Sequence, residues 1–212
     1  MKKKIIFIIP AFNEEKNLKK VINDFKKYGD IITINDNSID QTKVIADKYS
    51  NYVINNKERL GYDSSIRLGI KFVLKNLKEK EIVFTIDGDG QHVASEVPKF
   101  LKKVKNCDAV IGKRDFYNRY SEYIVGFFSK QIDNINDPLS GFKCYRKNYL
   151  VKLFKILKKI DYIGMFFLEK NKNIKQVNIR IKKNSKSSIG SGLKIDLKIL
   201  ITYFKVRFNL IF

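Results

Sequence analysis

The first part of the chain alternates short apolar runs with segments of helical period. Residues 5–9 read IIFII and residues 31–34 read IITI, and uniformly apolar runs of this length are typical of strands buried on both faces. Apolar residues at three- and four-residue spacing predict an amphipathic helix between them: Leu18, Val21, Ile22 and Phe25. We expect Asn13 to cap this helix, with Glu14 and Glu15 in its first turn. The pattern therefore predicts a strand-helix-strand unit.

The same alternation continues to residue 111 and predicts the fold class. The further elements expected are a helix at 40–49, a strand at 52–54, a helix with apolar residues from 66 to 77, a strand at 82–86, a helix at 97–104 and a strand at 109–111. Buried strands separated by helices predict an α/β fold, with a mostly parallel sheet and helices on both faces. Such sheets bind their ligands at the carboxyl ends of the strands.

The second half of the chain is patterned less clearly. No element is predicted between Arg114 and residue 147. The elements expected after it are a helix at 148–159, an apolar stretch at 165–168 and a strand near 177–181.

The C-terminal end differs from the rest in composition. Residues 182–192 are basic and rich in serine and glycine, which suits a flexible connection. Residues 193–212 mix aliphatic and aromatic residues with four cations, as in a helix that lies at a membrane surface, and a plain packing helix is the alternative. We therefore expect one domain over 1–192, followed by an amphipathic helix over 193–212.

Charge narrows the classes of partner. The chain has 43 Lys and Arg against 22 Asp and Glu, a formal net charge of +21, which favours nucleic acid, a phospholipid surface or nucleotides. The sequence shows no nucleic-acid-binding module in which these cations alternate with aromatic residues. Charge is therefore the only feature that supports nucleic-acid binding. Cys107 and Cys144 have no metal-ligand spacing, and we expect a reduced, cytoplasmic setting. No apolar run is long enough to span a membrane.

Polar residues follow the predicted strands at the point where each ends. They are Pro10, Asn13 and Glu14; Asn35, Asp36, Asn37, Ser38 and Asp40; Asp87, Asp89 and Gln91; Lys113 and Arg114. Because the carboxyl ends of parallel strands meet at one edge of a sheet, we expect these side chains to converge there.

The segment IDGDGQH contains the most informative of these residues. Asp87 and Asp89 are two apart, so in extended geometry they face the same side, where their charges repel unless a cation lies between them. Mg²⁺ or Mn²⁺, with Gln91 as a further oxygen ligand and Gly88 leaving room for a nucleotide, is one interpretation. A solvated DGDG turn explains the residues equally well. His92 is interpreted as a surface or positioning residue.

Asp36 has two interpretations of the same kind. A carboxylate at a strand end can accept a hydrogen bond from a nucleobase N–H, and an Asx turn is the plainer alternative.

Six blocks in order along the chain carry a family resemblance. They are IIPAFNEE, NDNSIDQT, GYDSSIRLG, IDGDGQH, VIGKR and DPLSGFKCYR. Together they resemble the family-2 glycosyltransferases, and most nearly the dolichyl-phosphate mannosyltransferase and polyprenyl-phosphate glucosyltransferase branch. The resemblance implies a GT-A fold and inverting transfer of a hexose from a nucleotide-diphosphate sugar, of the GDP-mannose or UDP-glucose type, to a polyprenyl phosphate.

The resemblance also implies roles for individual residues. Pro10, Phe12, Glu14, Asp36 and Gly88 would flank the nucleotide sugar, while Asp87, Asp89 and Gln91 would hold Mg²⁺ or Mn²⁺ on its diphosphate. Arg114 and Arg119 would meet phosphates, and Ser140 and Lys143 lie in the acceptor-side SGF motif, where arginine is usual in place of Lys143. Asp137 is the candidate general base if the acceptor is a hydroxyl, with a turn before Pro138 as the alternative.

The chain departs from the family pattern at several positions. Asn35 stands where aspartate is usual, Asp63 replaces the second glycine of a GxGxAxxxG-like block, the small residue of that block is Ser65, and the segment between Arg114 and Asp137 is short. No QxxRW motif is present, which argues against a processive synthase.

Three readings of the function remain open at this point. The first is a peripheral enzyme at the cytoplasmic face of a membrane, using a nucleotide-sugar donor and a polyprenyl phosphate. The second is a transferase acting on the hydroxyl of a glycan or lipid-linked sugar. The third, and most remote, is a non-enzymatic nucleic-acid-binding protein.

Overall fold

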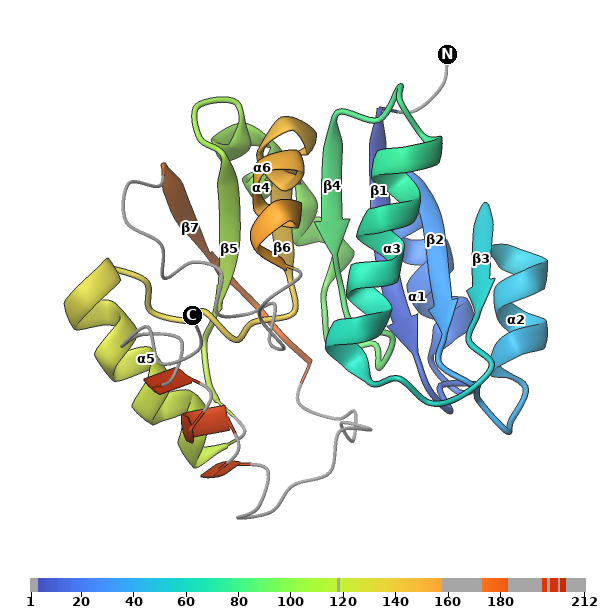
Figure 1. Cartoon of the computed structure of the whole chain (residues 1–212), viewed down its shortest axis with the longest axis horizontal. Helices are drawn as coiled ribbons and strands as arrows, with labels where there is room; N and C mark the ends of the chain where they lie inside the picture. The colour runs from blue at the N-terminus through green and yellow to red at the C-terminus, as the bar shows by residue number, and fades with distance from the viewer. Residues whose placement is uncertain are drawn as a thin grey trace.

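A seven-stranded sheet in the order β3-β2-β1-β4-β6-β5-β7 runs through the protein (Figure 1). The computed structural model describes residues 4–117, 119–157, 173–182, 196–197, 199–201 and 203–204. The strands are β1 (Ile5–Ala11), β2 (Asp30–Asn35), β3 (Tyr52–Asn55), β4 (Ile82–Thr85), β5 (Ala109–Arg114), β6 (Lys143–Arg146) and β7 (Ile174–Ile179). The α-helices are α1 (Leu18–Lys26), α2 (Thr42–Tyr49), α3 (Tyr62–Asn76), α4 (Val97–Val104), α5 (Tyr120–Asp133) and α6 (Lys147–Leu157).

All strands but one point the same way. The pairs β1–β2, β1–β4, β2–β3 and β5–β7 are parallel, whereas β6 pairs antiparallel with both β4 and β5. The carboxyl ends of β1, β2, β4 and β5 therefore lie along one edge of the sheet, as the alternating pattern predicted.

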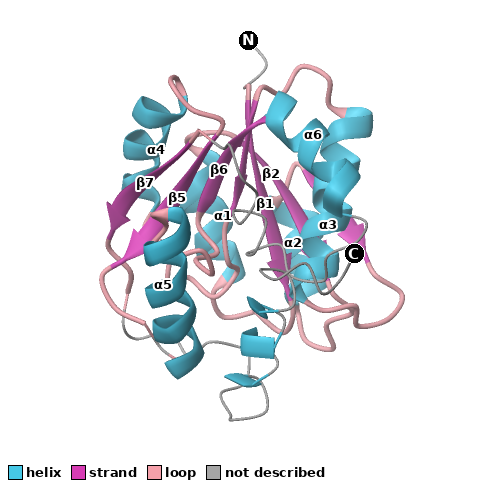
Figure 2. Cartoon of the chain, turned by 60° about the vertical axis from the view of Figure 1, so that its left-hand side comes forward, coloured by secondary structure: helices cyan, strands magenta, loops and turns pink. Residues whose placement is uncertain are grey.

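Helices cover both faces of the sheet (Figure 2). One face carries α3 and α6, whose apolar residues pack with Ile6, Ile8 and Tyr145 in a single cluster. The other face carries α1 and α4, which pack on Phe7, Ile9 and their neighbours. A sheet covered on both faces explains why its inner strands have uniformly apolar sequences.

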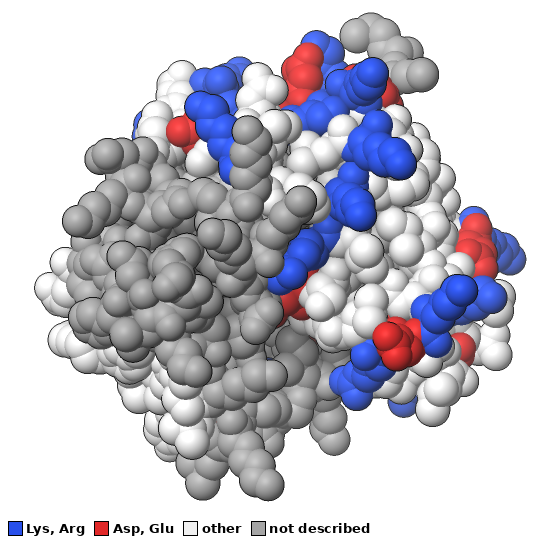
Figure 3. Space-filling model, in the orientation of Figure 1, with Lys and Arg blue, Asp and Glu red and all other residues white. Residues whose placement is uncertain are grey.

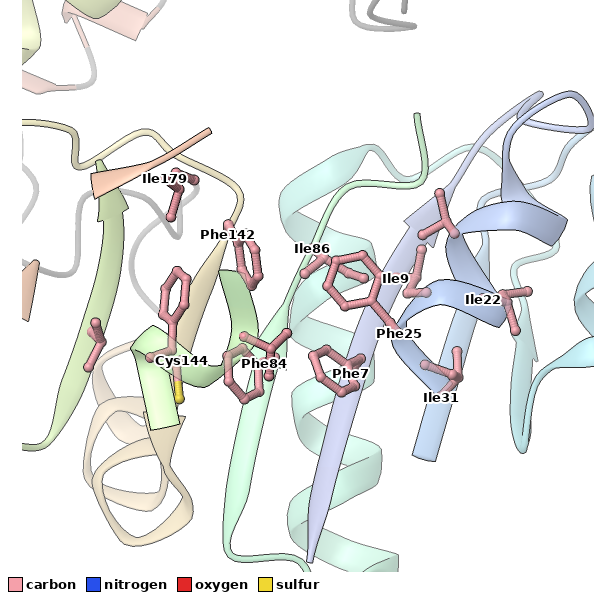
Figure 4. Close-up of a cluster of buried hydrophobic side chains, with 14 of the residues drawn as sticks. Phe7, Ile9, Ile22, Phe25, Ile31, Phe84, Ile86, Phe142, Cys144 and Ile179 are labelled. Atoms are coloured by element: carbon pink, nitrogen blue, oxygen red, sulfur yellow. The ribbon is translucent and has the colours of Figure 1, made fainter. Parts of the chain in front are cut away.

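Stacked aromatic rings fill the α1 and α4 face (Figure 4). The Phe7 and Phe84 rings are stacked with their centroids 4.8 Å apart, and the Phe100 and Phe142 rings are stacked at 4.4 Å. Phe84 connects the two pairs, because its ring centroid is 5.7 Å from that of Phe100 and 6.1 Å from that of Phe142. This packing joins β1 and β4 to the part of the chain that enters β6.

Most predicted elements are confirmed to within a few residues, but two expectations were wrong: the start of the first helix, with Asn13 as its cap and Glu14 and Glu15 in its first turn, and the lack of an element after Arg114. Asn13 does not cap α1, because the helix begins at Leu18 and Asn13 has a positive φ of 55° in the preceding turn. Its side chain instead accepts a hydrogen bond from the Ile39 N–H at 3.0 Å. The stretch after Arg114, for which no element was predicted, contains α5 and β6.

Parts of other predictions fall outside the described residues. The apolar stretch at 165–168 and most of the segments 182–192 and 193–212 are among them. Within the described ranges, no helix is long and apolar enough to cross a bilayer.

The aromatic packing predicts a large difference between two Phe→Ala changes. Phe84 is fully buried and Phe127 on α5 is 61% exposed. Phe84→Ala should lower the free energy of unfolding by about 3–5 kcal/mol, and Phe127→Ala should change it by less than about 0.5 kcal/mol. Urea unfolding measures both, and similar losses in the two variants would contradict the core as described.

Candidate functional site

Asp87 and Asp89 lie in the turn that follows β4, close to the end of β1. The Asp89 carboxylate accepts the Gln91 N–H at 3.0 Å and is 7% exposed. Gly88 between them has little room, because a Cβ there would lie 3.1 Å from the Pro10 carbonyl oxygen and 3.6 Å from Glu14 Cγ. The turn therefore packs against the residues that follow β1, as the convergence at this edge predicted.

The lack of a side chain at Gly141 leaves the space that the Asp87 carboxylate occupies. A Cβ at Gly141 would lie 2.3 Å from Asp87 Oδ1, so no other residue fits there without moving the carboxylate. The Gly141 carbonyl oxygen accepts the Thr85 hydroxyl at 2.8 Å, which ties the SGF motif to the end of β4. Asp87 Oδ1 is buried and has no hydrogen-bond partner in the protein, so it is available to a ligand.

His92 is a positioning residue and not a surface residue. It is 5% exposed, and its Nδ1 accepts the Asp87 N–H at 3.1 Å while its Nε2 lies 3.5 Å from Asp87 Oδ2. Burial lowers the pKa of His92 and so favours the neutral ring, although the charge of Asp87 acts in the opposite direction. A neutral ring protonated at Nε2 fits both contacts.

The turn holds more negative charge than nearby groups balance. Burial first, and then the charges of Asp87 and Glu14, raise the pKa of Asp89 to about 7. Glu14 is itself 5% exposed, and its Oε2 accepts the Asn17 amide at 3.2 Å. A cation beside these carboxylates would relieve their repulsion.

The donor set suits a hard divalent cation that is only partly held by the protein. Oxygen ligands and the unpartnered Asp87 Oδ1 fit Mg²⁺ or Mn²⁺. Among the described residues, however, no three His, Cys, Asp or Glu side chains gather into a ready-made metal site. One or two carboxylates plus substrate phosphates is an arrangement typical of Mg²⁺, and the residues present fit that arrangement.

Asp36, expected to contact a nucleobase, holds the loop after β3. Its Oδ1 accepts from the Asn56 amide and the Leu60 N–H, and its Oδ2 accepts from the Gly61 N–H, all at 2.8 Å. Neighbouring Asn35 donates to Asn55 Oδ1 at 2.9 Å. These bonds shape the wall of the site beyond β2.

Phe12 is partnered by a residue that the sequence did not single out. The Arg59 guanidinium carbon lies 3.9 Å from the centroid of the Phe12 ring. The pair joins the segment after β1 to the loop held by Asp36. No short sequence pattern predicts a cation–π pair between residues so far apart in the chain.

Arg114 and Asp137, predicted to act in catalysis, form a buried ion pair. Arg114 Nε and Nη2 donate to the two Asp137 oxygens at 2.7 and 2.8 Å, and the Arg114 N–H donates to Oδ2 at 3.1 Å. Arg114 Nη1 also lies 3.2 Å from Glu122 Oε1 on α5. We call these three residues the arginine cluster. Desolvation acts to lower the pKa of Arg114, but Asp137 and Glu122 raise it overall, so the guanidinium stays charged.

The remaining acceptor-side residues surround the same region. Lys143 is buried, and its Nζ donates to the Ser140 carbonyl oxygen. Burial lowers the pKa of Lys143 to about 8, against the opposing effects of Asp137 and Asp87. The Ser140 hydroxyl oxygen is buried with no partner in the protein. Arg119 precedes the first residue of α5.

The structure thus brings the predicted residues into two neighbouring groups. The carboxylates of Glu14, Asp87 and Asp89 form one, and Lys143 with the arginine cluster forms the other. Sequence reasoning missed Glu122, which lies in a stretch with no predicted helix, and the constraint at Gly141, for which the SGF motif was the available signal.

Comparison with known proteins gives a family match. The family described as Glycosyl transferase family 2 matches residues 6–168. A protein of Methanocaldococcus jannaschii, named only as uncharacterized, is 34% identical over an alignment of 168 positions that covers 69% of this chain and 73% of that protein. A UDP-N-acetylglucosamine–dolichyl-phosphate N-acetylglucosaminyltransferase of Methanococcus voltae is 27% identical over 236 aligned positions that cover 93% of each protein.

Solved structures give the same fold. Glucosyl-3-phosphoglycerate synthase from Mycobacterium tuberculosis, in complex with Mn²⁺, UDP and glucosyl-3-phosphoglycerate, has a TM-score of 0.67 and 16% identity to this chain. The similarity covers 96% of this chain and 79% of that one. It confirms the predicted GT-A fold class.

The raised pKa of Asp89 predicts how stability depends on pH without metal. The ordinary value is 3.8 and the folded value about 7, so the folded state binds more protons between these values. The free energy of unfolding therefore falls as pH rises from about 4 to 7. In Asp89→Asn, the decrease in the free energy of unfolding that is due to Asp89 should be absent. The variant should therefore be more stable than the wild type at pH 8, by on the order of 2 kcal/mol.

Urea unfolding in EDTA across this range measures the effect. The control is Asp24→Asn, since Asp24 pairs with Lys20 on α1 at 3.0 Å and is a third exposed. Its curve should follow the wild type. An Asp89→Asn curve with the wild-type slope would show that Asp89 titrates normally.

Proposed function

The chain belongs to glycosyl transferase family 2, and from this premise we propose that it transfers a hexose from a nucleotide-diphosphate sugar to a polyprenyl phosphate with inversion at the anomeric carbon. The observation that carries the proposal is the buried Asp89 carboxylate, whose pKa is raised by burial and by the charges of Asp87 and Glu14, next to Asp87, whose Oδ1 has no hydrogen-bond partner in the protein. The relative from Methanococcus voltae, named for transfer to dolichyl phosphate, supports the acceptor class.

The donor side follows from the carboxylate turn. Asp87 and Asp89, with Gln91 as a third oxygen donor, would hold Mg²⁺ or Mn²⁺ against the diphosphate. When bound, the cation supplies charge neutralisation for the departing nucleoside diphosphate. The solved neighbour of the same fold, crystallised in complex with Mn²⁺ and UDP, supports a divalent cation together with a nucleoside diphosphate. The nucleotide would lie over Pro10, Phe12 and Gly88, with Asp36 positioning the adjoining loop. Donors of the GDP-mannose and UDP-glucose type both fit this description.

The acceptor side favours an anionic nucleophile. Both oxygens of Asp137, the candidate base for a hydroxyl acceptor, already accept hydrogen bonds from Arg114. Because both oxygens are engaged in a buried ion pair, an acceptor hydroxyl would have to displace one of these bonds to reach Asp137. A polyprenyl phosphate needs no base: its oxygen forms the bond to the anomeric carbon as the bond to the nucleoside diphosphate breaks.

Positive charge near the site supports a phosphate acceptor. Buried Lys143 and the Ser140 hydroxyl would orient it, with Arg119 at the start of α5 as a further phosphate contact. Figure 3 shows basic side chains in a row over α3, which carries Arg67, Lys71 and Lys75 at four-residue spacing. Such a row raises the local concentration of anionic substrates. A lipid acceptor also implies that the enzyme works at a membrane surface, and we propose the cytoplasmic face.

The donor proposal predicts metal-dependent stabilisation by a nucleoside diphosphate. With Mn²⁺ present, GDP or UDP at 100 times its dissociation constant should raise the melting temperature of the wild type by about 5–10 °C. Asp89→Ala should lose this shift and the transfer activity while remaining folded, and Asp24→Ala should keep both. A wild-type protein that no nucleoside diphosphate stabilises, with or without the metal, would refute the donor class.

The acceptor proposal predicts a modest effect of Asp137→Asn on transfer to polyprenyl phosphate. Loss of a general base lowers turnover by about 10²–10⁴-fold. We expect less than a tenfold loss per folded molecule, together with lower stability, because a buried ion pair is broken. Glu122→Gln is the matched control, since it weakens the arginine cluster without removing a candidate base.

Both variants should therefore behave alike in a transfer assay with labelled donor. Two results would support the hydroxyl-acceptor reading: a loss confined to Asp137→Asn, or wild-type product formed only with glycan acceptors.

A further inference from the structure

Helix α5 presents an apolar stripe to the outside of the protein. Its large side chains at positions one, four, five, eight and nine are exposed: Tyr120, Tyr123, Ile124, Phe127 and Phe128. Tyr120 is 81% exposed and Phe127 is 61% exposed. This spacing is the amphipathic pattern of a helix with a binding face, but here the face points outward.

The described residues near the C-terminus extend this stripe. Ser121 donates a hydrogen bond to Asp196, and the Phe128 and Phe204 rings are 5.6 Å apart. The segment therefore lies along α5, as both views of the ribbon show (Figures 1 and 2). Its Leu197 is 58% exposed and its Ile201 is 45% exposed. We call the stripe on α5, together with Leu197 and Ile201, the apolar face.

The apolar face holds most of the exposed large hydrophobic side chains of the described residues. Others, such as Val44 on α2 and Val151 on α6, are on separate helices. Scattered exposed hydrophobic residues are ordinary on a soluble protein, but a contiguous group marks an interaction surface.

The charge around the stripe suits an anionic lipid surface. Glu122 is 7% exposed and turns inward to Arg114, so this carboxylate does not face outward beside the aromatic rings. Arg119 precedes the helix and Lys130 lies in its last turn, where it is exposed. Tyrosine and phenylalanine flanked by cations, on a chain of net charge +21, match a helix lying in the headgroup region of a bilayer.

The helix is fixed firmly to the acceptor side of the site. Besides the pair between Arg114 and Glu122, the Tyr117 hydroxyl donates to the Asn136 carbonyl oxygen at 2.8 Å. A Cβ at Gly126 would lie 2.7 Å from the same oxygen, so α5 packs directly on the segment that leads to Ser140. A surface on which α5 rests therefore has a defined position relative to Lys143 and Ser140.

We propose that the apolar face docks the enzyme on an anionic lipid bilayer and so presents the acceptor site to polyprenyl phosphate held in that bilayer. This inference rests on the proposed function for the identity of the acceptor. It moves the main membrane contact from the C-terminal helix, where the sequence suggested it, to α5. Phe204, in the predicted C-terminal helix, is half-buried and packs on Phe128.

Vesicle binding tests the docking surface. The full chain is mixed with vesicles of phosphatidylcholine containing a third phosphatidylglycerol, and the bound fraction is measured by flotation. Phe127→Asp should lower the partition coefficient about tenfold or more, because an inserted aromatic ring is replaced by a charge. Val44→Asp adds the same charge at a helix residue that is 58% exposed, and it should bind like the wild type.

Two transfer assays separate this inference from the proposed function. One uses a short, water-soluble prenyl phosphate without vesicles, and the other uses a long polyprenyl phosphate in the same vesicles. Phe127→Asp should keep wild-type turnover in the first assay and lose about tenfold in the second. Wild-type protein inactive with both acceptors would refute the proposed acceptor, whereas the vesicle-binding result would still decide the docking surface.

Three results would overturn the docking proposal. One is a wild-type protein that does not bind these vesicles. Another is equal vesicle binding by the wild type and Phe127→Asp. The third is a wild-type dimer in sedimentation that Phe127→Asp converts to a monomer, because the apolar face would then be an interface between two copies of the chain.

Discussion

The close contact between Gly141 and the Asp87 carboxylate is the constraint on which the site depends. It exists because β6 runs antiparallel between β4 and β5, with Thr85 opposite Lys143 and Phe84 opposite Cys144. The aromatic packing of Phe142 with Phe84 and Phe100 stabilises this pairing of β4 with β6. One short strand therefore joins the half of the sheet that carries the carboxylates to the half that carries Lys143 and the arginine cluster.

The two halves differ in how their buried charges are balanced. The arginine cluster pairs one guanidinium with two carboxylates at hydrogen-bonding distance, so it is satisfied without a ligand. Burial first, and then the charges of Asp87 and Glu14, raise the pKa of Asp89 to about 7, and Asp87 Oδ1 has no hydrogen-bond partner in the protein. Buried polar groups without partners cost stability, and a protein retains them where a ligand completes the arrangement. The imbalance distinguishes a binding site from a structural ion pair.

The sequence predicted which residues gather at the carboxyl ends of the strands better than it predicted which side chains pair with one another there. Apolar runs at residues 5–9 and 82–86 identified strands, and the topology of a parallel sheet then brought Glu14 and Asp87 together. The pairing of Asp137 with Arg114 depends on how the chain returns between β5 and β6, and no periodic pattern reports that. Helix α5 was missed because its outward aromatic stripe hides the usual contrast between a buried apolar face and a polar one. The same stripe is what suggests a membrane surface.

The account makes one central claim: the carboxylates after β4 bind a divalent cation together with a nucleoside diphosphate. A crystal grown with Mn²⁺ and GDP or UDP tests it most directly, by anomalous scattering from the manganese. The account predicts an anomalous peak between the Asp87 and Asp89 carboxylates and the diphosphate oxygens, with Gly141 still packed against Asp87. A diphosphate bound elsewhere, or bound at this edge with no peak beside either carboxylate, would contradict it.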